Sequence, residues 1–316
     1  MKIPQRRMKI PRLRMKIPWR PLLLAALLIV LPVVAACPGS RTTFDITAES
    51  EYVRYSPEIS PSQHWVLDSA SLFGAGDTAG TIVSGKLEFT DPVQVTIERR
   101  SLGPLLLKIE PTPARQRADA GRGAPLRVGV FNGRSGPSQP LYDDIVIEVP
   151  NVEERSRQGN PIVFAVQGSL QIGRSVQREG DPNLALLRSG KVTKFVESAK
   201  FLESAFGKSA FVAGSSDLDV GDQVTIEAPE SPELGLIRAD ERPALTVAYR
   251  ADARSVDVGR PGGGHYRIGM SIAEWVLADP MLQGWWATLG LLFGALTLFR
   301  LADWGRKRTE KSHETE

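Results

Sequence analysis

The sequence predicts a mainly β protein with a membrane segment at each end. Its outer part is expected to be an extracytoplasmic β-sandwich or barrel-like domain with one short helix. Three observations support this: many short apolar segments separated by Gly/Pro turns, a basic leader followed by an apolar run, and an uncharged stretch near the C-terminus. The expected order is a leader and signal peptide or signal anchor (1–37), a β-rich region (41–267), a juxtamembrane amphipathic helix (270–280), a transmembrane helix (281–300) and a cytoplasmic tail (301–316).

The first 20 residues form a basic leader with eight Lys or Arg residues, and no acidic residue occurs before Asp45. The phrase Met-Lys-Ile-Pro starts at Met1, Met8 and Met15. Its prolines recur in the same register and exclude a heptad helix, because each removes a helical hydrogen bond. An apolar run, PLLLAALLIVLPVVAA, follows. Basic, apolar and small residues in this order are typical of a secretory signal.

Cys37 is the only cysteine, so no intramolecular disulfide can form. It directly follows Val34, Ala35 and Ala36. Small residues before a cysteine resemble the lipobox of bacterial lipoproteins, although valine stands where that motif usually has leucine. The resemblance makes Cys37 a lipidation candidate. The alternatives are cleavage nearby and an uncleaved signal segment.

Residues 41–267 carry the β pattern. Apolar and β-branched residues alternate or cluster in ten segments: TFDITAE, GTIVSGKLEFT, VQVTIERR, PLLLKIEP, LRVGVFNG, DIVIEVP, PIVFAVQGSLQIG, SAFVAG, DQVTIEAP and ALTVAYRA. Turn pairs such as Asn132-Gly133 and Gly221-Asp222 separate them. Short strands with such turns are typical of sandwiches and barrels. The polar segment 112–125 is expected to be an exposed loop or a seam between two β units.

Segment 194–207, KFVESAKFLESAFG, instead predicts a helix packed across the sheet. Its apolar residues fall at helical spacing, and Gly207 suits a C-cap. Those apolar residues are Phe195, Ala199, Leu202 and Phe206. Strand alternation would place Glu197 among apolar side chains on one face.

Few outer residues have recognisable chemistry. Asp217, Asp219 and Asp222 are oxygen ligands at short spacing and form a calcium candidate, although their order departs from an EF-hand and a turn also explains them. His64 and His265 could serve a hydrolase with nearby carboxylates, because catalytic triads are recognised by geometry. The sequence has no HExxH, no Cys/His cluster and no GxSxG. We therefore expect no catalytic site and no cofactor.

The segment GMSIAEWVLADP (269–280) predicts a short helix before the membrane. Ser271 and Glu274 have the spacing of a capping box, and Pro280 ends the segment. The face of this helix is mainly apolar, so we expect it at the membrane surface. A flexible joint at Gly262–Gly264 is expected to connect it to the β domain.

Residues 281–299 contain no charge and, as a helix, extend about 28 Å, enough to cross a bilayer. Trp285 and Trp286 lie at one end, where an aromatic belt would be. Ala287, Gly290 and Gly294 are small residues on nearly one face. They predict self-association of the helix, or packing against another small-faced helix.

The charge distribution predicts the topology. Basic residues in the leader and from Arg300 to Lys311 favour a cytoplasmic C-terminus with the β domain outside. Residues 21–299 hold 26 basic and 32 acidic residues, so the pI of about 9.0 comes from the two ends and gives no reason to expect nucleic-acid binding. The chain is expected in the bacterial inner membrane. Its β domain would be a non-enzymatic module for a protein or envelope polymer, and the alternative is a membrane-tethered hydrolase.

Overall fold

The computed structural model describes residues 42–58, 64–74, 79–119, 124–134, 137–174, 186–197, 210–226, 231–232, 234–261 and 263–313. The fold of this part is mainly β, as the sequence predicts, and its strands form two antiparallel sheets. All ten predicted strand segments contain strands. The predicted leader, including Cys37, lies outside the described residues.

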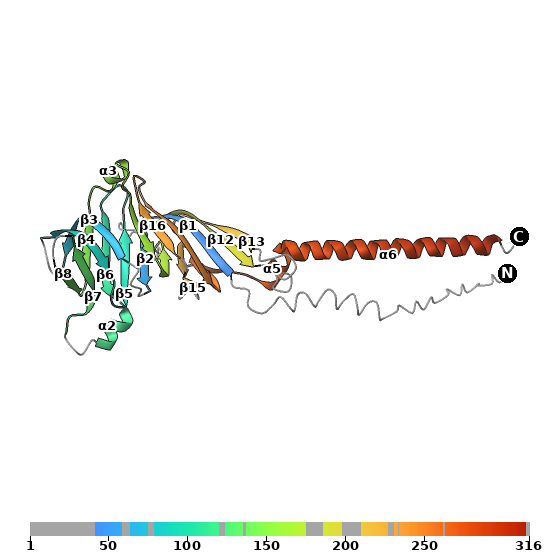
Figure 1. Ribbon diagram of the computed structural model, residues 1–316, viewed down its shortest axis with the longest axis horizontal. Helices are drawn as coiled ribbons and strands as arrows, with labels where there is room; N and C mark the ends of the chain where they lie inside the picture. Colours follow the sequence, from blue (N-terminus) through green and yellow to red (C-terminus); the bar gives the residue numbers. More distant parts are fainter. Residues whose placement is uncertain are drawn as a thin grey trace, which may run out of the picture.

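The first sheet lies next to the C-terminal helix, and we call it the near sheet (Figure 1). In spatial order its strands are β10 (Ile162–Val166), β16 (Gly235–Ala239), β17 (Leu245–Ala253), β1 (Thr42–Ser50), β12 (Leu187–Glu197) and β13 (Ala210–Leu218), with β15 (Ser231–Pro232) pairing beside β17. In β1, Phe44, Ile46 and Ala48 are buried, one at every second residue. This period of two places them on one face of the sheet.

The second sheet has twelve strands, and we call it the long sheet. Its spatial order is β19 (His265–Gly269), β18 (Ser255–Gly259), β14 (Gln223–Ile226), β11 (Gly168–Ile172), β2 (Tyr52–Pro57), β5 (Val93–Glu98), β6 (Leu105–Pro111), β9 (Ile145–Val149), β3 (His64–Phe73), β4 (Thr81–Glu88), β7 (Arg127–Gly133) and β8 (Ser138–Tyr142). Strands β3 to β9 are one continuous stretch of chain and occupy one side of this order. With α2 (Pro113–Asp119) and α3 (Val152–Arg157), they form what we call the far end (Figure 1).

Among the described strands, the chain passes from the near sheet to the long sheet four times, from β1 to β2, β10 to β11, β13 to β14 and β17 to β18, and it returns from β9 to β10, β11 to β12 and β14 to β15. At the β10–β11 crossing Gly168 has φ +145°, and a Cβ there would lie 2.2 Å from the Ser56 carbonyl oxygen. Only glycine fits this close approach. The Tyr249 hydroxyl donates to the Gly168 carbonyl, and burial raises the pKa of Tyr249 to about 12. The phenol therefore stays a donor at ordinary pH.

One hydrophobic cluster includes buried residues of both sheets, so the two sheets share a core. Trp65 of β3 lies near its centre and contacts Phe164 of β10, with ring centroids 4.5 Å apart. Tyr55 and Phe89 also lie beside the Trp65 ring. The indole Nε1 donates to the Ala165 carbonyl at 2.9 Å, which satisfies its polar group inside the core.

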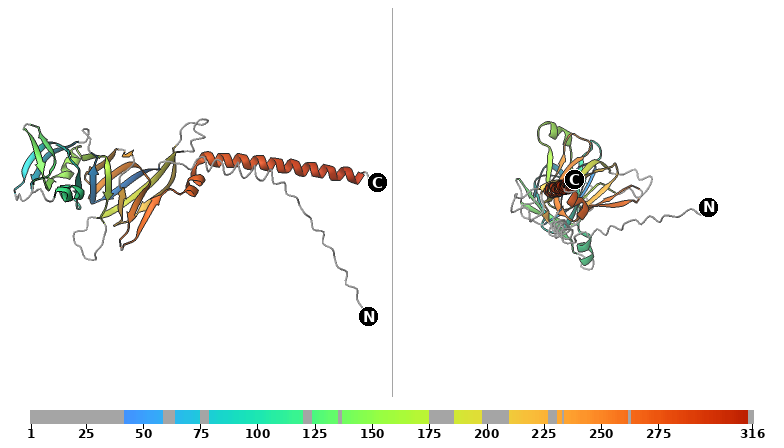
Figure 2. Two further views of the ribbon diagram at one scale, coloured as in Figure 1. Left: turned by 90° about the horizontal axis from the view of Figure 1, so that it is seen from below. Right: turned by 90° about the vertical axis from the view of Figure 1, so that its right-hand side faces the viewer.

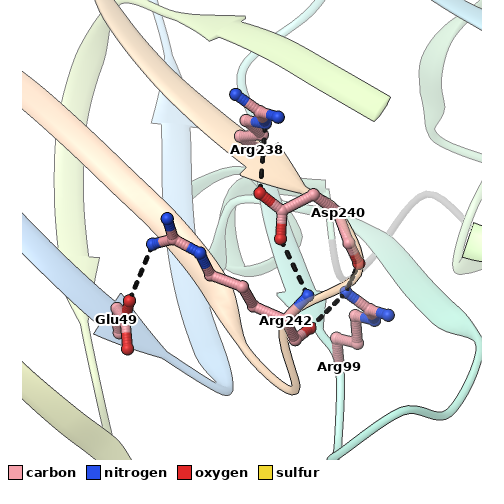
Figure 3. A network of polar contacts seen from close by, with 5 residues as sticks. All are labelled: Glu49, Arg99, Arg238, Asp240 and Arg242. Atoms are coloured by element: carbon pink, nitrogen blue, oxygen red, sulfur yellow. Dashed lines mark hydrogen bonds and ion pairs between the residues drawn. The ribbon is translucent and has the colours of Figure 1, made fainter. Parts of the chain in front are cut away.

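Arg99 joins the far end to the near sheet (Figure 3). It follows β5, is fully buried, and donates through Nη1 to the carbonyls of Asp240 and Arg242 in the turn between β16 and β17. Burial lowers the pKa of Arg99, and the charges of Glu153 and Asp240 oppose that shift. The Asp240 carboxylate in turn accepts the Arg242 backbone N–H at 2.9 Å. The Arg99 guanidinium thus binds the turn between β16 and β17, and the Asp240 carboxylate stabilises the same turn from within.

One sequence expectation needs correction, and the possible seam at 112–125 stays a prediction. Segment 112–125 begins with helix α2 and follows β6 on the way to β7, another strand of the long sheet. Lys194–Glu197, the start of the predicted helix, ends strand β12, which pairs with both β1 and β13. Two neighbouring strands supply backbone partners that helical spacing cannot reveal. Residues 198–207 of that predicted helix lie outside the described residues.

Candidate functional site

The C-terminal helix α6 (Pro280–His313) is the most exposed apolar element of the described structure. Its stretch Leu282–Asp303 is long and apolar enough to cross a membrane. None of the 18 consecutive residues that make this stretch most apolar is buried against the β domain. These 22 residues extend about 33 Å as a helix. The core helix of a globular protein would be buried, so this exposure favours a membrane environment. The predicted span, 281–300, nearly coincides with this stretch.

Two hydroxyl groups in this stretch are satisfied inside the helix. The Thr288 hydroxyl donates to the Gly284 carbonyl at 2.8 Å, and the Thr297 hydroxyl donates to the Phe293 carbonyl. A polar group in hydrocarbon needs such an internal partner, because no water is present there. These two hydroxyl groups are thus compatible with a lipid environment.

A short helix, α5 (Ile272–Ala278), precedes α6, and its predicted capping box is confirmed. The Glu274 backbone N–H donates to the Ser271 hydroxyl, and the Ser271 backbone N–H donates to the Glu274 carboxylate, both at 3.1 Å. The bond from the Ser271 backbone is the main reason that the pKa of Glu274 is lowered. The helix start is therefore fixed locally.

Helix α5 is attached to the near sheet by an apolar cluster. Trp275, Leu282 and Val196 are buried together. Partly buried apolar residues from β13, from the segment between β19 and α5, and from the two helices pack around them, and these are Phe211, Ala213, Met270, Val276 and Trp286. Because Trp275 belongs to α5 and Leu282 to α6, both helices are held against β12 and β13.

Lys194 adds a polar contact to the same attachment. It is a buried residue of β12, and its ammonium donates to the Gly269 carbonyl at 3.2 Å and lies 3.5 Å from the Glu274 carboxylate. The sequence did not predict this role, because Lys194 was expected at the start of a helix. A lysine on the inward face of a strand gave no signal in the sequence.

Only Asp279 lies between α5 and α6, and its carboxylate accepts the Leu282 backbone N–H at 3.3 Å. Asp279 thus caps α6, with Pro280 as the first helical residue, which are favoured residues at these positions. Gln283 also donates from its side chain to the Leu277 carbonyl at 2.5 Å. We call α5, Asp279 and the first turn of α6 the elbow, visible where α6 leaves the near sheet (Figure 2).

The predicted flexible joint at Gly262–Gly264 is wrong. The chain continues past it into β19, which pairs with β18 along its length. The Arg260 backbone N–H donates to the Gly264 carbonyl at 2.6 Å, so Gly263 and Gly264 belong to a hairpin turn, and Gly262 lies outside the described residues. The β domain therefore reaches α5 through paired strand rather than through a loose linker.

In the described part of the chain, two cavities lie in the far end. The first, of about 430 Å³, is formed where the β5–β6 turn meets α3, and its lining includes Glu148, Glu153, Glu154 and Arg157. The second, of about 710 Å³, lies at the β8 side of the long sheet. It is lined by Ile82, Val83, Ser84, Phe131, Gly133, Arg134, Pro137, Ser138, Gln139 and Pro140. Ile82 is 78% exposed, so this second cavity opens beside an uncovered apolar side chain.

The two histidines of the hydrolase alternative are not brought together. His64 begins β3 opposite Glu88, and His265 begins β19 opposite Gly259. Both are exposed, and neither lines the two far-end cavities. The geometry gives this alternative no support.

Two of the three aspartates of the calcium candidate, Asp219 and Asp222, have protein partners, and Asp217 is a residue of β13. The Asp222 carboxylate is buried and accepts the Asp219 backbone N–H at 3.0 Å. The Arg260 guanidinium lies 3.4 Å from the Asp219 carboxylate and 3.9 Å from that of Asp222. Among the described residues no three His, Cys, Asp or Glu side chains are grouped to hold a metal ion. The segment is thus a turn before β14, and the calcium candidate gains no support.

The small residues of the span, Ala287, Gly290 and Gly294, are exposed on α6. A Cβ added at either glycine would meet no atom within 4 Å beyond the neighbouring backbone of α6 itself. Association of this face with another helix stays a prediction.

The molecule thus combines a helix suited to a membrane, a fixed elbow, and cavities at the opposite end of a β domain. No protein-family model matches the chain, and neither a curated protein nor a solved structure matches it.

Proposed function

We propose that the chain is a membrane-anchored bacterial envelope protein whose β-sandwich domain is a non-enzymatic binding or assembly module outside the cytoplasm. The observation that carries this proposal is the exposed apolar helix α6, joined through the elbow to a β domain without a linker. A protein built in this way holds its domain at a membrane surface. In this proposal the leader directs export, and Cys37 is the residue at which lipidation would occur.

The binding role is assigned to the far end, which stands opposite the anchor (Figure 1). Ligand and partner sites are usually concave and partly apolar, and the cavity at β8 has both properties. The partner would be a protein or an envelope polymer. The stripe of Ala287, Gly290 and Gly294 offers a second contact, with another helix in the membrane.

The topology is tested with paired reporters in the full chain. Helix α2 has no buried residue, so a reporter inserted at Arg117 should leave the core intact. Basic residues after the span favour the cytoplasm for the C-terminus. We expect alkaline phosphatase to be active at Arg117 and inactive after Glu316, and a fluorescent protein to show the reverse. Reports of the same side from both positions would contradict the proposal.

The binding role is tested with a photo-crosslinking amino acid at position 82 of the full chain in intact cells. Because Ile82 is exposed beside the β8 cavity, we expect an adduct of defined mass from this position. Leu236, also an exposed residue of a strand but in the near sheet, is the matched control and should not give that adduct. Identical adducts from both positions, or none from position 82, would refute a site at the far end.

A further inference from the structure

Helix α5 has two opposite faces. Trp275 is 4% exposed and packs on the near sheet, whereas Leu277 is 73% exposed. Two residues along a helix correspond to a rotation of about 200°, so Leu277 points away from the sheet that holds Trp275. The outer face of α5 is thus fixed in direction by the burial of Trp275.

This outer face is nearly free of charge. Its side chains are those of Ala273 and Leu277, with Glu274 beside them as the one ionisable group. The Glu274 carboxylate accepts the Ser271 backbone N–H and lies beside the Lys194 ammonium. A helix that faces bulk water usually carries several charged residues. Helix α5 carries only Glu274, which already contacts Ser271 and Lys194.

The outer face is also close to the membrane span. Four residues lie between Leu277 and Leu282, where the membrane-compatible stretch begins, so the two Cα atoms are five steps and at most about 18 Å apart. The bond from Gln283 to the Leu277 carbonyl shortens this connection. Trp285 is exposed in the first turns of α6, and tryptophan is favoured at the membrane–water boundary.

We propose that the outer face of α5, centred on Leu277, lies in the headgroup–acyl boundary of the lipid bilayer and seats the near sheet on the membrane surface. The inference rests on the proposed membrane anchoring of α6. A lipid surface is the occupant because the exposed Leu277 lies within about 18 Å of the start of the span, and no linker lets the β domain stand away from it. The far end then points into the aqueous compartment at a fixed orientation.

The experiment uses the full chain in phosphatidylcholine–phosphatidylglycerol nanodiscs. Replacing Cys37 by serine leaves one introduced cysteine for a spin label at Leu277, Leu291 or Tyr142. Leu291 is an exposed residue within the span, and Tyr142 is an exposed residue of β8 at the far end. Since all three side chains are exposed, labelling should not disturb the core. The readout is the collision rate of each label with oxygen, which concentrates in lipid, and with a nickel chelate, which stays in water.

We expect the oxygen-to-chelate ratio at Leu277 to be several-fold higher than at Tyr142 and lower than at Leu291. A ratio at Leu277 equal to that at Tyr142, with Leu291 in lipid, would overturn the seating while leaving the anchor intact. Water-like ratios at all three positions would overturn the anchor and the seating together.

Discussion

Replacing Arg99 by alanine should lower the free energy of unfolding by about 3–5 kcal/mol, because two buried carbonyls lose their donor and a cavity opens. Those carbonyls belong to Asp240 and Arg242, and the Arg99 Nε also points to the Gly103 carbonyl at 3.4 Å. Lysine at position 99 keeps the charge but cannot span the same acceptors, so its loss should be intermediate. Urea unfolding of the full chain in detergent, followed by circular dichroism, measures the change.

Arg100 is the matched control. It is the next residue, its side chain is about half exposed, and it lies 3.5 Å from the Glu98 carboxylate at the surface. Replacing it by alanine should change stability by no more than about 0.5 kcal/mol, because exposed ion pairs contribute little. Equal unfolding of the two alanine variants would show that the Arg99 network does not stabilise the connection between the far end and the near sheet.

Replacing Trp65 by alanine should cost about 3–5 kcal/mol, the range for removing a large buried aromatic residue. The ring contacts both sheets, and its loss also leaves the Ala165 carbonyl without a donor. Phenylalanine at this position keeps an aromatic ring and loses the N–H, so we expect about 1–3 kcal/mol. The same urea titration gives both values.

Val66, the neighbour of Trp65 on β3, faces the other way and is 53% exposed. Its replacement by alanine should stay within about 0.5 kcal/mol of the wild type. If alanine at position 65 were tolerated as well as alanine at position 66, the shared core of the two sheets would not depend on this ring.

The local features of the fold could be predicted from the sequence, and the long-range ones could not. Alternation with period two located strands such as β5 and β17, because it depends only on neighbouring residues. The capping box of Ser271 and Glu274 was predictable for the same reason. By contrast, nothing near Arg99 indicates burial, since its carbonyl partners lie 141 and 143 residues away in the chain.

Two errors had a shared physical cause. The charged residues Lys194 and Glu197 argued against a strand at this position. In the structure the Lys194 ammonium contacts the Gly269 carbonyl and the Glu274 carboxylate, which are far along the chain. The glycines at 262–264 suit a linker and a hairpin turn equally well, and only the pairing of β18 with β19 decides between them. In both cases a tertiary partner outweighs the local pattern.

The strand order has a consequence for the sequence of events during synthesis. The strands of the far end, β3 to β9, follow one another in the chain. They pair with one another, and the β2–β5 pair is their link to the rest of the long sheet. These strands can therefore assemble soon after residue 149 has left the ribosome. Strand β1 is the first of the described strands to be synthesised. Its residue Thr42 pairs with Val196 of β12 and with Ala253 of β17, and both of these are synthesised much later. Pairings between distant residues form slowly, because a long loop must close first. The first strand to be made is therefore among the last to be flanked on both sides.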